Sequence, residues 1–513
     1  MALAKVFAFG LYGLTGTLIE VEADISAQLP NFILVGLPDA SLAESTSRVR
    51  AACGNSGFNF PSQKIVVNLS PAAVPKSGSG FDLAIAVSVL TAMGKIPAAA
   101  VQGMCFLGEL GLDGSVRAVP GVLPVALAAK QAGLSRLVVP AGNAGEASLV
   151  AGIEVWSCRT LGALVRRLNG EVVSEDWDVP RLTHSPTATQ ANLDLSEVVG
   201  QAEAVEGLIV AAAGGHHLSM IGAPGSGKTM LAERLPGLLP QLSAEQAVEL
   251  AAIESVVGDG QRAIGLNRMP RFQAPHHSVS RAALIGGGTG IPRPGSVSLA
   301  HHGVLFLDEA LEFQSNVLEG LREPLESGSV LINRTSGSAR YPAKFQLVLA
   351  ANPCPCGLKG NKKATCKCNP LVIRRYSSRL SGPILDRIDI RLNVQSASIS
   401  ALAGIGKPLT STEIAAKSVA EARAAAAERL IPHGVVLNAH LSGPLLRKHF
   451  HPGKQAMKQL DSLAGQARLS MRGYDRCLRL AWTLADLDGA TTPNHEHVAR
   501  AVALRGTDSL VAS

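Results

Sequence analysis

Short apolar runs separated by Gly- and Pro-rich turns fill the first 170 residues of the chain. Short runs bounded by such turns predict strands, and longer apolar stretches at helical spacing predict helices. The predicted strands are residues 32–35, 64–69, 106–110 and 136–140, and the predicted helices are residues 84–93 and 122–132. This mixture indicates an α/β or α+β domain over residues 1–171.

After a polar stretch at residues 172–192, which we interpret as an exposed linker, the pattern changes to strands that are each followed by a helix. Such alternation predicts a parallel sheet covered by helices, here over residues 193–397. Its predicted elements are strand 218–221, helix 228–238, strand 304–307 and strand 345–350. Strand signals then stop, and helices are predicted at 413–430, 455–466, 474–484 and 495–504. Residues 398–513 therefore form a helical C-terminal domain, and the fold class is α/β.

Composition narrows the class of protein. Hydrophobic residues make up 47% and charged residues 17% of the chain, which excludes wholesale disorder. No secretory signal and no membrane-spanning run is visible, so a cytoplasmic protein with no membrane partner is expected. The net charge is +7, and residues 351–400 alone carry nine Lys/Arg against two Asp. The basicity is thus local, and aromatic residues are too scarce to favour a base-stacking platform.

The run Gly222-Ala-Pro-Gly-Ser-Gly-Lys-Thr229 matches the Walker A pattern at every fixed position, between a predicted strand and a predicted helix. Its glycines let backbone N–H groups form an anion nest, and the following helix N-terminus adds its positive dipole end. Lys228 reaches the β- and γ-phosphates, and Thr229 offers a hydroxyl to Mg²⁺. The nucleotide-contacting residues we predict are Gly222, Gly225, Ser226, Gly227, Lys228, Thr229, Met230 and Asp308.

Two further strand ends carry polar residues. The apolar run Val304–Leu307 ends in Asp308, which would hold Mg²⁺, and Glu309, which would polarise the attacking water. Alone, such a run is often just a strand that ends at solvent; after a Walker A match the catalytic interpretation is favoured. Asn352 follows another apolar strand and either orients water or the γ-phosphate or forms a simple turn before Pro353.

Two arginines extend the pattern. Arg387 stands just before a fourth strand, where it would stabilise phosphoryl transfer in a neighbouring subunit, or else form a surface pair with Asp386 or Asp389. Arg472 opens a C-terminal helix, where it contacts nucleotide or is a solvated helix residue.

Walker A, Walker B, the strand-end Asn, the Arg before a strand and the helical Arg stand in one order, which resembles an AAA+ ATPase. The longer motifs are Ala274-Pro-His-His-Ser278, Pro294-Gly-Ser-Val-Ser-Leu-Ala-His301, Leu321-Arg-Glu-Pro-Leu-Glu-Ser-Gly328, Asn352-Pro-Cys-Pro-Cys-Gly357, Arg374-Arg-Tyr376 and Leu380-Ser-Gly-Pro-Ile-Leu-Asp-Arg387. With them the chain resembles the YifB/ComM family of magnesium-chelatase-like AAA+ proteins over essentially its whole length.

The resemblance implies a homohexameric ring that uses ATP and Mg²⁺ and works as a DNA helicase driving branch migration in natural transformation, with recombination proteins as further partners. The implied roles are Walker A for Lys228 and Thr229, Walker B for Asp308 and Glu309, sensor 1 for Asn352, trans arginine finger for Arg387 and sensor 2 for Arg472. In related chelatases a helical insert displaces the lid, so sensor 2 is expected to act on a neighbour's nucleotide.

The N-terminal domain is similar to a Lon protease domain, through Pro75-Lys-Ser-Gly-Ser-Gly80 and Gly108-Glu-Leu-Gly-Leu-Asp-Gly114. The likeness puts Gly80 where the nucleophilic Ser belongs and Leu123 where its Lys belongs. Neither can do nucleophilic chemistry, so we expect a structural tier and no peptidase. The alternative is a shifted register that uses Ser77 or Ser79 with Lys130.

Four cysteines, Cys354, Cys356, Cys366 and Cys368, stand within 15 residues. Such a set suits tetrahedral Zn²⁺; the alternatives are free thiols or a redox pair. The enclosed loop is rich in lysine and either contacts DNA phosphates or is a solvated charged loop. A predicted hairpin at 330–342, with Asn333-Arg-Thr-Ser-Gly-Ser338 at its turn, and a segment at 271–293 with Gly286-Gly-Gly288 offer Arg, Ser and Gly where protein unfoldases usually show an aromatic in their pore loop. This favours a phosphate backbone over a polypeptide. The predicted DNA-contacting residues are Arg281, Arg334, Arg340, Lys359, Lys362 and Lys363.

The expected function is an ATP-dependent DNA motor. One alternative is a chelatase-like or chaperone-like ATPase that remodels a protein partner; another is a protease-associated ATPase, against which the lost dyad argues. We assign the pair His276-His277 to no metal.

Overall fold

The structure is a computed structural model of the 513-residue chain. It describes residues 2–36, 42, 44–72, 76, 78–172, 193–258, 266–288, 291–334, 337–359, 365–380, 382–395, 410–466 and 469–506. Within these residues no helix is both long and apolar enough to cross a membrane. The predicted linker at 172–192 lies almost wholly outside the described residues.

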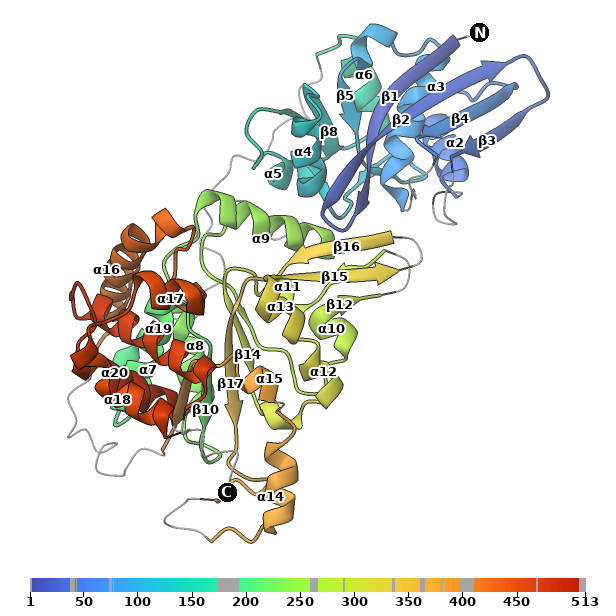
Figure 1. Ribbon diagram of the computed structural model, residues 1–513. Coiled ribbons are helices and arrows are strands. Elements are labelled where there is room, and N and C mark those ends of the chain that lie inside the picture. Colours follow the sequence, from blue (N-terminus) through green and yellow to red (C-terminus); the bar gives the residue numbers. More distant parts are fainter. Residues whose placement is uncertain are drawn as a thin grey trace.

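A seven-stranded mixed sheet with the strand order β3-β4-β2-β1-β5-β8-β9 forms the N-terminal domain (Figure 1). Its strands are β1 (Ala2–Tyr12), β2 (Thr15–Ser26), β3 (Asn31–Val35), β4 (Lys64–Ser70), β5 (Met104–Phe106), β8 (Arg136–Pro140) and β9 (Glu154–Cys158). Its helices are α2 (Ser45–Asn55), α3 (Asp82–Ala92), α4 (Val122–Gln131), α5 (Ala144–Ala147) and α6 (Leu161–Leu168). In the β1–β2 hairpin, alternate residues such as Val6 and Val21 are fully buried, as a half-covered strand requires.

Most sequence-predicted elements of this domain are confirmed to within two residues. The prediction of one strand at 106–110 is wrong, because the chain leaves the sheet after β5 and pairs again as β6 (Glu109–Leu110) with β7 (Val116–Arg117). The break lies at Gly108, where an added Cβ would come within 2.8 Å of a Val116 side-chain carbon. The long β1–β2 hairpin was not predicted, since Gly10, Gly13 and Gly16 around its turn interrupt the strand pattern.

The central domain has a five-stranded sheet with the order β11-β14-β17-β10-β18, in which every pairing is parallel. Its strands are β10 (Leu218–Ile221), β11 (Phe272–Gln273), β14 (Val304–Leu307), β17 (Gln346–Ala351) and β18 (Ile390–Asn393). Its helices are α7 (Ala202–Gly214), α8 (Lys228–Leu238), α9 (Ala244–Val257), α10 (Arg281–Ile285), α11 (Ser296–Leu299), α12 (Ser315–Glu319), α13 (Arg322–Ser327), α14 (Pro370–Ser377) and α15 (Gly382–Leu385). Two small hairpins are β12 (Gly286–Gly287) with β13 (Arg293–Pro294), and β15 (Ser329–Arg334) with β16 (Gly337–Pro342).

The apolar strands of this sheet are buried on both faces, which explains their continuous hydrophobic runs. In β14, Val304 and Phe306 join a core shared with α7, α8 and the C-terminal helices, whereas Leu305 and Leu307 join a second core under α10 to α12. Because all five strands are parallel, their carboxyl ends meet at one edge. The P-loop, Asp308 and Asn352 all follow strands at that edge.

The C-terminal domain is helical and packs beside α7 and α8, as Figure 1 shows in orange and red. Its helices are α16 (Thr412–Leu430), α17 (Gly443–His449), α18 (Lys454–Gly465), α19 (Met471–Leu487) and α20 (His495–Arg505). The four predicted helices are confirmed, and α17 was not predicted. The α19 helix begins three residues before the predicted stretch 474–484, in agreement with the expectation that Arg472 opens a helix. The Ser470 hydroxyl caps it by accepting from the Gly473 N–H.

The N-terminal domain contacts the central domain at two places. Ser255, on α9, accepts a bond from the Gly121 N–H with its carbonyl at 2.9 Å and from the Leu123 N–H with its hydroxyl at 3.3 Å. The free N–H groups at the start of α4 are thus satisfied by another domain. The β1–β2 turn reaches the β15–β16 hairpin, where an added Cβ on Gly13 would lie 3.0 Å from the Ala339 Cβ.

Candidate nucleotide site

The loop between β10 and α8 has the backbone that the Walker A pattern requires. Gly225 and Gly227 have φ of +73° and +88°, a region that other residues avoid, and Gly227 caps α8. At Gly222 an added Cβ would lie 2.3 Å from the Val394 carbonyl oxygen, so only glycine fits beside β18. The Met230 side chain packs against the core below the loop.

The Lys228 side chain is buried at the centre of the loop. Its Nζ donates to the carbonyls of Gly222 at 2.8 Å and Ala223 at 3.0 Å, and to Asn352 Oδ1 at 3.2 Å. Burial lowers the pKa of the Lys228 ammonium, against the opposing charges of Asp308 and Glu309. The Ser226 hydroxyl is buried without a hydrogen-bond partner among the described residues. The Lys228 ammonium, the Ser226 hydroxyl and the N–H groups of the glycine-lined loop are the donors that a bound polyphosphate needs.

Both predicted carboxylates lie beside the loop. Thr229 Oγ1 donates to Asp308 Oδ2 at 2.8 Å, and Asp308 Oδ1 accepts from the Glu309 N–H at 2.8 Å. Glu309 has φ of +49°, which is unusual for a residue with a side chain and turns it out of the strand line. A hydroxyl and a carboxylate in contact are the oxygen ligands that Mg²⁺ prefers.

Two residues at this site were not predicted. His277 Nδ1 lies 3.2 Å from Glu309 Oε2, so the His276-His277 pair reaches the sheet edge that carries Asp308 and Glu309. These histidines follow β11, a two-residue strand that was not predicted from the sequence and whose carboxyl end meets the same edge as Asp308. Gln201, just before α7, donates Nε2 to the Ser226 carbonyl at 2.7 Å and to the Gln395 carbonyl at 3.1 Å. It ties the P-loop to the segment after β18.

The two predicted arginines lie at the opposite edge of the sheet. Strands β10 and β18 run parallel, with Leu218 paired to Ile390 and Ile221 to Asn393. Arg387 lies before the start of β18, whereas the P-loop follows the end of β10, so the two lie at opposite ends of this strand pair. The four-residue strands alone separate these ends by roughly 10 Å. Arg387 pairs with Glu326 and donates to the Pro383 carbonyl, whereas Arg472 lies 3.1 Å from Asp386.

The alternative prediction, a surface pair of Arg387 with Asp386 or Asp389, is therefore wrong, because both aspartates have other partners. Asp386 contacts Arg472 instead. Asp389 is buried, contacts Arg476 and lies 2.9 Å from His216. Burial lowers the pKa of Arg387, as do the nearby charges of Arg472 and Arg476. Arg387 and Arg472 thus belong to one cationic cluster.

The four cysteines of the predicted metal set come together. Cys354 Sγ lies 3.4 Å from Cys356 Sγ and 3.6 Å from Cys366 Sγ, and all four sulfurs, with Cys368, lie within 4.8 Å of one another. The Leu358 N–H, then the thiols of Cys368 and Cys354, lower the pKa of Cys356 to about 6. Four thiols at this spacing, one already inclined to ionise, fit a tetrahedral Zn²⁺ site.

The predicted DNA-contacting arginines are exposed, and two of the basic segments meet. Arg334 Nε donates to the Gly288 carbonyl at 3.2 Å, which joins the β15–β16 hairpin to the Gly-rich segment after Arg281. Arg340 lies on the same hairpin, 3.4 Å from the Ser329 hydroxyl. Lys359 is exposed beside the cysteines, and its N–H donates to Cys354 Sγ. Lys362 and Lys363 lie outside the described residues.

In the N-terminal domain, the residues near the expected dyad positions are engaged elsewhere. Leu123 is fully buried at the contact with α9. The Ser79 hydroxyl donates to Glu109, and the Lys76 ammonium donates to the Pro71 carbonyl. Ser77 lies outside the described residues.

Comparison with known proteins agrees with this geometry. Family profiles described as magnesium chelatase subunit ChlI match residues 21–143 and 194–402, and its C-terminal profile matches residues 409–505. The competence protein ComM of Haemophilus influenzae is 39% identical over 508 residues, which cover 98% of each chain. The chain belongs to the YifB/ComM family of magnesium-chelatase-like AAA+ ATPases.

Other members of the family match as fully. The protein YifB of Escherichia coli is 39% identical over 512 residues, covering 100% of this chain and 98% of that one. An uncharacterised protein of Mycobacterium tuberculosis is 49% identical over 507 residues, covering 99% of both. The architecture of this YifB/ComM protein is thus an N-terminal Lon-like α/β domain, an AAA+ core and a helical lid.

Proposed function

We propose that this YifB/ComM protein is an ATP-driven ring motor that moves on branched DNA. Assembly into a ring is supported by one observation: Arg387 and Arg472 lie at the sheet edge opposite Lys228. Neither arginine can serve the P-loop of its own chain, so a second copy must complete each site. Such head-to-tail contacts generate a closed ring when the rotation between subunits closes, and related ATPases close as hexamers.

Each side chain then has a role in hydrolysis. Lys228 and the loop N–H groups would hold the phosphates of ATP, and Thr229 and Asp308 would hold Mg²⁺, which neutralises phosphate charge when bound. Glu309 accepts the proton of the attacking water, and Asn352 orients that water. His277, 3.2 Å from the Glu309 carboxylate, holds it before substrate arrives.

DNA as the substrate is supported by the basic segments and by the family. Arg334 and Arg340 on the β15–β16 hairpin and Arg281 on α10 are exposed, whereas Tyr341 of the same hairpin is fully buried and offers no stacking surface. Such contacts grip phosphates, so binding is salt-dependent and weakly sequence-specific. Lys359, Lys362 and Lys363 of the cysteine loop are proposed as further phosphate contacts, and of these Lys359 is exposed. The proposal places the protein in the cytoplasm, in natural transformation and beside recombination proteins, and a relative named competence protein supports the role in transformation.

Two structural assignments belong to the same proposal. The domains are 1–171, 193–397 and 398–513, joined by the linker 172–192. Cys354, Cys356, Cys366 and Cys368 would hold one Zn²⁺ that folds the basic loop.

The deciding experiment compares the ATPase rate of the full chain with no DNA, with a duplex, with a four-way junction and with an unfolded protein. We expect the junction to stimulate most and to be resolved only when ATP is hydrolysed. Stimulation by unfolded protein, with none by any DNA, would instead identify a protein remodeller. Arg387→Ala should form rings and bind ATP yet hydrolyse it at least about 10³-fold more slowly.

A further inference from the structure

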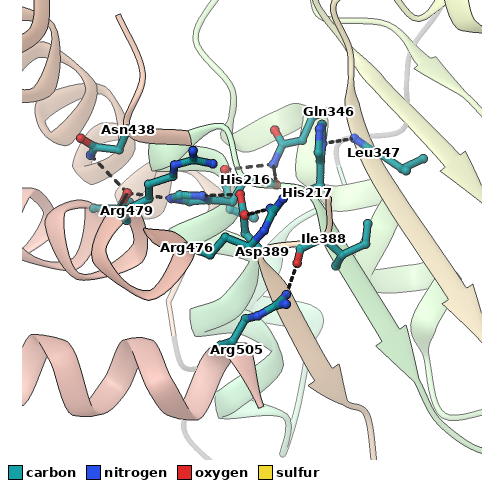
Figure 2. Close-up of polar contacts among 12 residues, drawn as sticks. His216, His217, Gln346, Leu347, Ile388, Asp389, Asn438, Arg476, Arg479 and Arg505 are labelled. Carbon is teal, nitrogen blue, oxygen red and sulfur yellow. Dashed lines mark hydrogen bonds and ion pairs between the residues drawn. The ribbon is translucent and has the colours of Figure 1, made fainter. Parts of the chain in front are cut away.

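A buried polar cluster joins the sheet edge that carries Arg387 to the helical lid (Figure 2). At its centre Asp389, 2% exposed, contacts Arg476 of α19 through one carboxylate oxygen. The other oxygen lies 2.9 Å from Nδ1 of His216, which follows α7. Three elements distant in sequence are therefore tied together by a single carboxylate.

Further contacts hold this centre in place. His216 Nε2 lies 2.8 Å from the Thr483 hydroxyl, which also accepts from Asn438 Nδ2 at 3.2 Å. The backbone N–H of Asp389 donates to the His217 carbonyl at 3.1 Å. Burial would raise the pKa of Asp389, but the His216 hydrogen bond and the Arg476 charge hold it well below its ordinary value. The carboxylate is thus a fixed, ionised acceptor.

The geometry links this cluster to the two arginines of the neighbouring site. Arg387 is two residues before Asp389, and Arg472 is four residues before Arg476, one turn away on the same face of α19. Two ion pairs therefore connect the approach to β18 with α19: Asp386 with Arg472, which is exposed, and Asp389 with Arg476, which is buried.

We propose that the buried Asp389–Arg476 pair, supported by His216 and Thr483, is a positioning link that presents Arg387 and Arg472 as one unit to the nucleotide of the adjacent subunit. The inference rests on the proposed function. Asp389 and Arg476 touch no substrate. Asp389 holds Arg476 in the buried pair, whereas Arg387 and Arg472 pair with the more exposed carboxylates of Glu326 and Asp386, which phosphate would replace.

The first test is Asp389→Asn in the full-length chain, measured as kcat, KM and affinity for a fluorescent ATP analogue. We expect kcat to fall about 10²-fold, as for a group displaced by about 1 Å. KM and nucleotide affinity should stay unchanged, because the P-loop of the same chain lies at the other edge. The matched control is Asp386→Asn, which breaks only the exposed pair and should cost much less.

The second test mixes two inactive proteins. Lys228→Ala has a defective P-loop but intact arginines, and Asp389→Asn has the reverse. In equimolar mixed rings, about a quarter of the interfaces should combine a working P-loop with working arginines and recover hydrolysis. A purely structural defect in Asp389→Asn would not be rescued this way.

An unchanged kcat in Asp389→Asn, a raised KM, or no recovery on mixing overturns the inference. If Asp389→Asn does not assemble, Arg476→Lys replaces it in the same kcat and mixing measurements. This variant keeps the charge but loses the guanidinium geometry. Arg387→Ala distinguishes a failure of the proposed function from a failure of the positioning link. If it keeps full kcat, the proposed trans site fails; if it loses kcat while Asp389→Asn does not, only the positioning link fails.

Discussion

Gly357 of the cysteine loop lies against Pro224 of the P-loop, and Gly357→Ala tests that contact. Gly357 has φ of +74°, and an added Cβ would lie 2.4 Å from Cδ and 2.6 Å from Cγ of Pro224. Such distances are too short, so either the cysteine loop or the P-loop must move. Pro224 is part of the phosphate loop, and its displacement would misalign the loop N–H groups.

The loss of folding stability in Gly357→Ala has two contributions, backbone strain and overpacking, and a control variant separates them. Left-handed backbone costs an Ala roughly 1–2 kcal/mol, and overpacking adds about 1–3 kcal/mol. Gly434 has φ of +72° with nothing within 4 Å of an added Cβ. Gly434→Ala therefore suffers the strain alone, and the difference between the two variants isolates the clash with Pro224.

The assay is thermal unfolding of both variants together with affinity for a fluorescent ATP analogue. We expect both to lose stability, Gly357→Ala more, and only Gly357→Ala to lose nucleotide affinity, by about tenfold if 1.4 kcal/mol of the clash reaches the loop. Equal stability loss and unchanged nucleotide affinity in both variants would refute the contact between cysteine loop and P-loop.

Four further predictions follow from the same geometry. Glu309→Gln should lower kcat about 10²–10⁴-fold while nucleotide binding and unfolding temperature stay near the parent values, because the side chain is half-exposed with one ion pair; normal turnover would exclude Glu309 as the base. Metal analysis should find about one zinc per chain, reduced in Cys366→Ser, and a metal-free parent protein would end that assignment. Burial lowers the pKa of His217 and His301 to about 4 from 6.5. Between those values the unfolded chain binds more protons, so stability should fall on acidification; an unfolding temperature unchanged from pH 7 to pH 5 would contradict this. Arg334→Ala should weaken DNA binding on all sequences alike and reduce the salt slope by about 1, and a sequence-dependent loss would argue for base contacts.

Local chemistry made much of the site predictable. The Walker A loop was predictable because its glycines, lysine and threonine are adjacent in sequence. The glycines set the backbone conformation, and Lys228 and Thr229 follow directly after them. Asp308 and Asn352 could be placed because parallel strands bring their carboxyl ends to one edge. His277 was missed, since its partner Glu309 stands 32 residues later and only strand order brings them together.

The sequence by itself determined the phosphate loop, the carboxylates that follow buried strands, the helical C-terminal domain and the family. These depend on residues close in the chain or on long motifs. Only the tertiary structure decided which partners Asp386 and Asp389 have, and that Arg387 and Arg472 share one edge away from Lys228. The physical reason is that ion pairs among many similar charges are selected by packing. Of two nearby aspartates, one is exposed and the other is buried against α19, and sequence spacing cannot tell them apart.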